Sequence, residues 1–141
     1  DYFERFAGVR AFLDRTVAEA RERGYVETIF GRRRYIPELR DSNFNMRAFG
    51  ERTAANSPLQ GSAADLIKVA MVRIAAALRI GPRARLILQV HDELVVECPA
   101  EEAEDVVRLV RCEMEGAAQL SVPLVVEVGI GDTWLDAKAG P

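Results

Sequence analysis

The sequence predicts an α+β fold, and three features of its pattern support this prediction. Apolar residues recur at intervals of three and four in segments long enough to form α-helices. Short runs rich in Val, Ile and Leu, bounded by Gly, Pro or polar residues, are typical of β-strands. The chain has 141 residues, of which 49% are hydrophobic and 29% charged, an ordinary composition for a globular chain that can bury a core.

The first part of the chain predicts a helix followed by a basic hairpin. The apolar stripe of residues 2–23 is typical of an amphipathic helix that Gly24 ends. Residues 25–30 alternate as a strand does, and Gly31 provides a turn. The chain then returns through Arg32, Arg33 and Arg34. Three arginines at the bend of a hairpin are either plain surface or a phosphate-binding site, and we favour the second interpretation.

The middle of the chain predicts two helices separated by a break. Residues 46–55 have a helical composition, and the Pro at position 58 is expected to end that helix and to start the next. Residues 58–79 then follow the helical period as a long, largely buried helix. Asn56 and Gln60 lie around the predicted break, where an amide would either cap a helix end or contact a ligand.

The most informative stretch is residues 86–97, which predicts a β-hairpin with a polar tip. Apolar runs flank the triplet His91-Asp92-Glu93 on both sides. Adjacent carboxylates at a tip are costly unless they meet water or a cation. They are therefore either a solvated acidic turn or ligands for a hard divalent cation such as Mg²⁺.

The predicted sheet combines the 86–97 hairpin with a strand at 124–130, all antiparallel. Helices 58–79 and 100–116 are expected to pack on one face of it, because a one-sided apolar stripe needs one apolar surface to cover. The residues expected to be buried there are Leu66, Ile67, Ala70, Ile74, Val106, Val107 and Val110.

Charge is distributed unevenly along the sequence. Residues 1–90 carry 16 Lys and Arg against 10 Asp and Glu, whereas residues 91–141 carry 3 against 12. This split favours an anionic partner for the first part and a cation for some of the second. No apolar run of about 18 residues occurs, so we expect no membrane partner.

The two cysteines, Cys98 and Cys112, form no CxxC pair, which argues against a zinc site and a disulfide framework. We expect a reducing, intracellular setting, with both thiols acting as small buried hydrophobes.

Several sequence strings, in a fixed order, resemble those of the family A DNA polymerases. These strings are Gly24 to Thr28, Gly31 to Tyr35, Glu51 to Asn56, Pro58 to Asp65 and Gln89 to Glu93. The resemblance covers essentially the whole chain with near-matching spacings, and QGSAAD and QVHDE are its most specific strings.

The resemblance implies the place of each segment in a polymerase. Residues 1–42 would be the C-terminal part of the fingers subdomain, with a helix and a basic hairpin. Residues 43–141 would be the C-terminal part of the palm, with an antiparallel sheet and a catalytic hairpin packed by long helices.

The resemblance also implies roles for individual residues. Asp92 would bind the catalytic metals, Glu93 would be an accessory carboxylate, and His91 would lie near the primer terminus. A second group would contact primer–template DNA, largely in the minor groove: Arg52, Asn56 and Gln60. Such donors suit this role, because minor-groove acceptors lie in similar places for every base pair.

The implied activity is template-directed DNA synthesis from dNTP, in DNA replication and repair, in the bacterial cytoplasm at the nucleoid. It uses two Mg²⁺ ions, which clamp the reacting oxygens. The family's other metal-binding aspartate motif and its nucleotide-binding fingers helix are absent from this sequence, so the two-metal site is incomplete. We therefore expect a piece of a longer protein, inactive alone, whose partner is the missing N-terminal part of the polymerase.

Two other functions remain as alternatives. His91-Asp92 is also found in HD phosphohydrolases, but those sites need several histidines and this sequence has one. A non-catalytic DNA-binding module is the stronger alternative, because the basic part is present while the catalytic set is incomplete.

Overall fold

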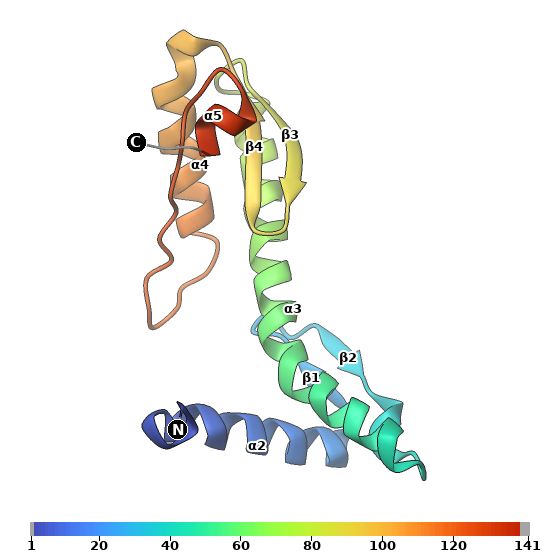
Figure 1. Cartoon of the computed structure of the whole chain (residues 1–141). Coiled ribbons are helices and arrows are strands. Elements are labelled where there is room, and N and C mark those ends of the chain that lie inside the picture. The colour runs from blue at the N-terminus through green and yellow to red at the C-terminus, as the bar shows by residue number, and fades with distance from the viewer. Residues whose placement is uncertain (1, 139–141) are drawn as a thin grey trace. The chain divides into compact units, whose positions relative to one another are not determined.

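The computed structural model describes residues 2–138 and contains α-helices together with two separate antiparallel β-hairpins (Figure 1). The predicted α+β class is confirmed. The chain divides between Asp65 and Leu66 into two compact units, which are described one at a time. The predicted boundary between subdomains at residues 42 and 43 stays a prediction.

The first unit begins with helices α1 (Tyr2–Arg5) and α2 (Ala7–Arg23). The predicted helix 2–23 is interrupted at Phe6, whose φ of −121° and ψ of 58° lie outside the helical region. Gly24 ends α2 as predicted. Its φ of 82° is the left-handed conformation that glycine adopts without strain, and its N–H donates to the Ala20 carbonyl at 2.8 Å.

The basic hairpin follows as strands β1 (Tyr25–Glu27) and β2 (Arg33–Tyr35), so β1 is shorter than the predicted strand. The two strands pair with Tyr25 opposite Tyr35 and Glu27 opposite Arg33. A 3₁₀ turn, η1 (Pro37–Arg40), leads to the long helix α3 (Phe44–Leu78). The buried core of this unit is Ala20, Val26, Ile36, Leu39 and Ala54.

Helix α3 runs through Pro58 without interruption, so the predicted break was wrong. Proline removes one backbone donor and normally breaks or kinks a helix. Here burial on both sides of it supports the helix, because Ala54 is fully buried and Ser57 and Ser62 are nearly so. The Ser62 hydroxyl also donates to the Pro58 carbonyl at 2.5 Å.

The second unit contains the C-terminal part of α3 and the hairpin of β3 (Arg85–Val90) and β4 (Glu93–Glu97). Leu86 pairs with Val96 and Leu88 with Val95, which leaves Ile87 as an extra residue in a bulge. The hairpin is followed by η2 (Ala100–Glu102), α4 (Ala103–Glu115) and α5 (Trp134–Lys138).

The core of this unit joins both long helices to one face of the hairpin. Its buried members are Ala70, Ile74, Val106, Val110 and Ala117. Leu94 and Val96 pack against them, and alternate residues of a strand point to one face. Both helices therefore cover the same face, as expected. Leu66 is half-buried against this core, whereas Ile67 and Val107 are half-buried outside it, which corrects their predicted burial.

The predicted strand 124–130 is absent, and the sheet of this unit has only β3 and β4 within residues 66–138. The alternation of residues that predicted this strand does correspond to alternating burial. Leu124, Val126 and Val128 are half-buried, while Val125 is 78% exposed. The Val126 N–H donates to the Glu115 carboxylate at 3.1 Å. Alternation thus identifies an extended segment but cannot supply the neighbouring strand.

The predicted burial of both cysteines holds only in part. Cys98 is half-buried against the second core, but Cys112 is exposed. Cys112 follows Val110 by two positions on α4, about 200° around the helix, so a buried Val110 directs Cys112 outward. No helix in residues 2–138 is long and apolar enough to cross a membrane.

Ile74→Ala should lower the free energy of unfolding by about 2–5 kcal/mol, because it leaves a cavity in a fully buried position. Val72→Ala is the matched control on the same helix, since Val72 is 70% exposed and its truncation should cost less than about 0.5 kcal/mol. Chemical denaturation measures both values. Equal destabilisation by the two variants would contradict the placement of the core.

Acid should destabilise the second unit through Glu102. The pKa of Glu102 is lowered, first by the side-chain hydrogen bond from Arg83 (2.6 Å) and then by that from the Arg83 backbone N–H. A lowered pKa gives stability that is present above the ordinary value and is lost as pH falls through the folded value. Arg83→Ala should therefore reduce the stability that is lost as the pH falls through and below the ordinary pKa range of a glutamate. Exposed Arg79→Ala is the control, and should leave that pH dependence unchanged.

Candidate functional site

The tip of the β3–β4 hairpin is a two-residue turn made by His91 and Asp92. Val90 and Glu93 are the last paired residues, so Glu93 is already the first residue of β4. His91 has a φ of 55°, the only positive φ of a non-glycine residue among residues 2–138. Two-residue hairpin turns require this conformation at their first position, and histidine adopts it more readily than most residues. The turn thus fixes where Asp92 begins.

The two carboxylates at this tip have different surroundings. Asp92 is exposed and makes no hydrogen bond or ion pair within the described part of the chain. Glu93 is half-buried, and its Oε1 lies 3.0 Å from Lys138 Nζ. Lys138 also lies over the Trp134 ring, 5.2 Å from its centroid. Glu93 is therefore charge-compensated inside the chain, whereas Asp92 faces solvent.

Two glycines make room for the short helix that carries Lys138. A Cβ on Gly129 would overlap the Ala137 carbonyl oxygen, and one on Gly131 would lie 2.6 Å from the Ala137 nitrogen. Real Cβ atoms do not approach this closely. The sequence Gly-Ile-Gly therefore lets α5 approach residues 129–131. Lys138 was not predicted to have this role, and the signal for it in the sequence is the pair of glycines at 129 and 131.

The hairpin supplies only part of a metal site. Within residues 2–138 no three His, Cys, Asp or Glu side chains are grouped so that they could hold a metal ion. Carboxylate oxygens are the donors that Mg²⁺ prefers, so Asp92 and Glu93 suit it chemically. Because Mg²⁺ takes six ligands, this pair would need donors from elsewhere.

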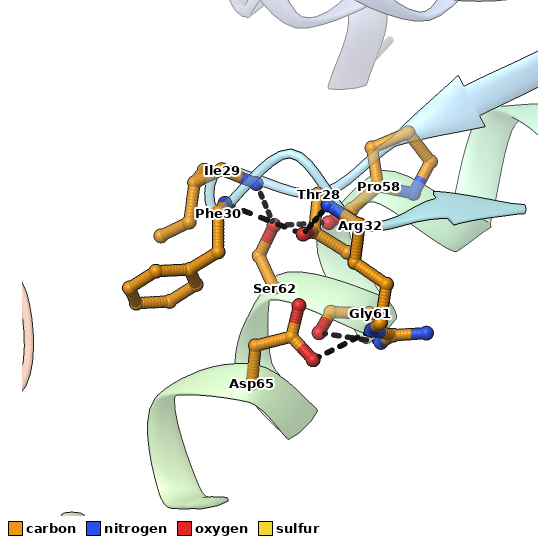
Figure 2. A network of polar contacts seen from close by, with 8 residues as sticks. All are labelled: Thr28, Ile29, Phe30, Arg32, Pro58, Gly61, Ser62 and Asp65. Carbon is orange, nitrogen blue, oxygen red and sulfur yellow. Dashed lines mark hydrogen bonds and ion pairs between the residues drawn. The ribbon is translucent and has the colours of Figure 1, made fainter. Parts of the chain in front are cut away.

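In the first unit, only one of the three consecutive arginines lies in the hairpin loop. Arg32 Nε is 2.8 Å from Asp65 Oδ1, and its Nη2 donates to the Gly61 carbonyl at 3.3 Å (Figure 2). Arg33 and Arg34 lie on β2, not at the bend as expected. Asp65 belongs to the QGSAAD string, but nothing in the sequence indicated it as a partner of Arg32.

Arg33 is also engaged within the chain. Its Nε lies 2.8 Å from Glu27 Oε1, and its guanidinium stacks 4.6 Å from the centroid of the Tyr25 ring. The pKa of Arg33 is raised, chiefly by its hydrogen bond with Glu27. Arg33 is thus fully charged but has a carboxylate partner at the surface.

Arg34 differs from its two neighbours. Its side chain is exposed and makes no hydrogen bond or ion pair within residues 2–138. It borders a cavity of about 230 Å³ that is also lined by Val26, Glu27, Thr28, Arg32, Ser57, Gln60 and Gly61. The structure therefore brings Arg34 and Gln60 to one cavity, where a cation and an amide are available to a ligand.

Arg52, Asn56 and Gln60 are exposed and follow one another at intervals of four residues along α3, so they share one face of it. The alternative role of Asn56 and Gln60 as helix caps required a helix end near residue 58. Because α3 continues through this region, neither residue caps a helix there. Their exposed polar groups remain available for a ligand.

Comparison with known proteins identifies the family. Residues 1–136 match the sequence family described as DNA polymerase family A. The chain belongs to DNA polymerase family A. DNA polymerase I of Streptococcus pneumoniae serotype 4 is 51% identical over 97% of this chain, which corresponds to 16% of that relative. The thermostable DNA polymerase I of Thermus aquaticus is 55% identical over the same share of the chain and of the relative.

A solved structure agrees with this family assignment. The POL domain of Pol1 from M. smegmatis, in complex with a DNA primer-template and dNTP, matches 97% of this chain and is 50% identical. Its TM-score is 0.94, and the match covers 24% of that solved chain. The resemblance to family A polymerases is therefore confirmed. Because the chain spans only 16% of its curated relatives, the roles of its individual residues in this family A chain stay predictions.

Proposed function

We propose that this family A chain is the C-terminal part of a DNA-directed DNA polymerase. With the rest of that protein, it would transfer nucleotides from dNTP to a primer 3′-hydroxyl on a DNA template. The observation that carries the proposal is the turn that presents Asp92 to solvent at a rigid hairpin tip, in a chain of this family. The expected setting is the bacterial cytoplasm at the nucleoid, in replication and repair.

The metal ions of this reaction would be Mg²⁺, held by Asp92 with Glu93 as an accessory ligand. Bound Mg²⁺ would polarise the phosphoryl oxygens and favour an ionised primer hydroxyl. The short Asp92 side chain keeps its oxygens close to the fixed backbone of the turn. Glu93 is longer and loses more rotamer freedom when it binds, and Lys138 already neutralises it. His91 would lie near the primer terminus.

Primer–template DNA would be bound by the first unit, through the exposed cations and amides that have no partner in the described residues. Arg34 and Arg52 supply positive charge, and Asn56 and Gln60 supply donors for the minor groove. Arg33 is exposed and could add positive charge, although Glu27 already neutralises its guanidinium. Arg32 was assigned the same role from sequence, but its guanidinium is bound to Asp65.

The activity requires the missing N-terminal part of the polymerase as partner, because two carboxylates cannot complete two metal sites. We therefore expect the isolated chain to be inactive. A non-catalytic DNA-binding module is the second candidate. The exposed side chains of Arg34 and Arg52 favour it, because they can bind DNA without a metal ion.

Asp92→Asn in the complete polymerase should abolish nucleotide incorporation and leave primer–template affinity nearly intact, because it removes a metal ligand while lowering repulsion of the phosphates. Glu93→Gln should slow incorporation much less, since Asp92 still holds the metal with the other aspartate of the complete protein. Single-turnover incorporation at several Mg²⁺ concentrations measures both, with DNA binding determined separately. Near-normal rates for Asp92→Asn would reject the enzymatic proposal and favour the binding module.

Arg34→Ala should flatten the salt dependence of primer–template binding by the complete polymerase. Removing one cation that neutralises a phosphate reduces the steepness of log K against log salt by about 0.9. Arg33→Ala should reduce it by less, because Glu27 already neutralises that guanidinium. Titrations across a series of KCl concentrations give the slopes, with Arg10→Ala, an exposed arginine on α2 beside Asp14, as control. If the slope for Arg34→Ala matches that of the wild type, Arg34 does not bind phosphate.

A further inference from the structure

We propose that Arg32 and Asp65 are positioning residues, which hold the loop of the basic hairpin on α3 and so set the place of Gln60 relative to Arg34. They would act on the DNA terminus through Gln60, without touching DNA. This inference rests on the proposed function. Because minor-groove acceptors lie in similar places for every correct base pair, Gln60 would distinguish a matched primer terminus from a mismatched one.

Three hydrogen bonds join the loop to one stretch of α3, and a fourth within α3 holds one of the acceptors; together they are called the clamp (Figure 2). Arg32 donates to Asp65 at 2.8 Å and to the Gly61 carbonyl at 3.3 Å. The Ile29 N–H donates to the Ser62 hydroxyl at 3.0 Å, and that hydroxyl donates to the Pro58 carbonyl. The loop and the helix are therefore joined by both side-chain and backbone groups.

The α3 side of the clamp is largely buried, so breaking its hydrogen bonds would leave buried polar groups without those partners. The side chain of Asp65 is only 11% exposed, and Ser62 is 9% exposed. Removing one member of a largely buried ion pair is strongly unfavourable. If Arg32 moved onto a phosphate, it would have to give up its 2.8 Å contact with Asp65. Arg32 is therefore poorly placed to serve as a DNA ligand.

The loop side of the clamp is itself rigid. The Thr28 hydroxyl accepts the N–H groups of Phe30 and Arg32, at 3.3 and 3.2 Å. Thr28 N–H also donates to the Arg32 carbonyl at 3.0 Å. Gly31 completes the turn with a φ of 78°. Because the loop is fixed internally, a shift of Arg32 would carry the start of β2, and with it Arg34.

Gly61 lets the helix come close to this loop. A Cβ at position 61 would lie 2.8 Å from Thr28 Cγ2 and 3.4 Å from Arg32 Nη2. Gln60 precedes this glycine, and both border the cavity that also includes Arg34. The close approach therefore forms one wall of the cavity and fixes Gln60 beside Arg34.

The test uses the complete polymerase with two readouts. The first is the slope of log K against log salt for primer–template binding. The second is the ratio of extension rates from matched and mismatched primer termini. Arg34→Ala should make the slope shallower by about 0.9, whereas Arg32→Ala should change it much less, because Arg34 keeps its charge even when the loop shifts. Arg32→Ala and Asp65→Asn should each lower the ratio by about fivefold, the equivalent of about one hydrogen bond.

A double-mutant cycle separates positioning from general damage. In a Gln60→Ala background, Arg32→Ala and Asp65→Asn should cause no further fall in the ratio, because they act through Gln60. Arg32→Lys keeps the positive charge. Its ratio of matched to mismatched extension rates should therefore lie between those of Arg32→Ala and the wild type. Gly61→Ala should resemble Asp65→Asn, and Gly8→Ala, whose added Cβ has no atom within 4 Å, is the control.

Three results would overturn the inference: a slope made as shallow by Arg32→Ala as by Arg34→Ala, an unchanged ratio, or effects that add to that of Gln60→Ala. Thermal unfolding of each variant accompanies these measurements. Should Asp65→Asn fail to fold, Arg32→Lys and Gly61→Ala carry the same test. Failure of the proposed function looks different, since Asp92→Asn would then leave incorporation unchanged.

Discussion

The burial of helix α3 is the constraint on which both units depend. Ala54 belongs to the core of the first unit, and Ala70 and Ile74 belong to that of the second. The helix persists through Pro58 because packing contributes more to helix stability than local propensity does. Its continuity has a chemical consequence. Polar residues at positions 52, 56 and 60 share one exposed face, and none of them is used as a cap.

Periodicity in the sequence predicted those features of the fold that depend on local pattern. It located the helical stripes, both hairpins and the end of α2 at Gly24, because each depends on residues close together in the chain. It failed where a distant partner decides the outcome. Pro58 lies in a helix because Ser57 and Ser62 are buried, and residues 124–130 form no strand because nothing in the described chain pairs with them.

The candidate site shows the same limit for charge. A run of three arginines predicts strong positive potential, but the count does not reveal how many of these cations are already neutralised. Arg32 has Asp65 and Arg33 has Glu27, so Arg34 alone of the three has no partner in the described residues. Neutralisation of Arg32 does not deprive it of a function, because an ion pair that is largely buried on one side can hold geometry where an exposed one cannot. On the proposed function, Arg32 would hold the loop in place and Arg34 would bind phosphate.

The two acidic residues of the β3–β4 turn follow the same logic. Asp92 is short and exposed and begins from a backbone fixed by the positive φ of His91, so its oxygens have few positions to occupy. Glu93 starts a strand and is compensated by Lys138, which Gly129 and Gly131 allow to approach. A cation at this tip would meet one preorganised carboxylate without a competing partner. To bind Glu93 as well, the cation would have to displace Lys138 or share the Glu93 carboxylate with it. The unequal surroundings of these adjacent carboxylates thus follow from backbone geometry and from one lysine.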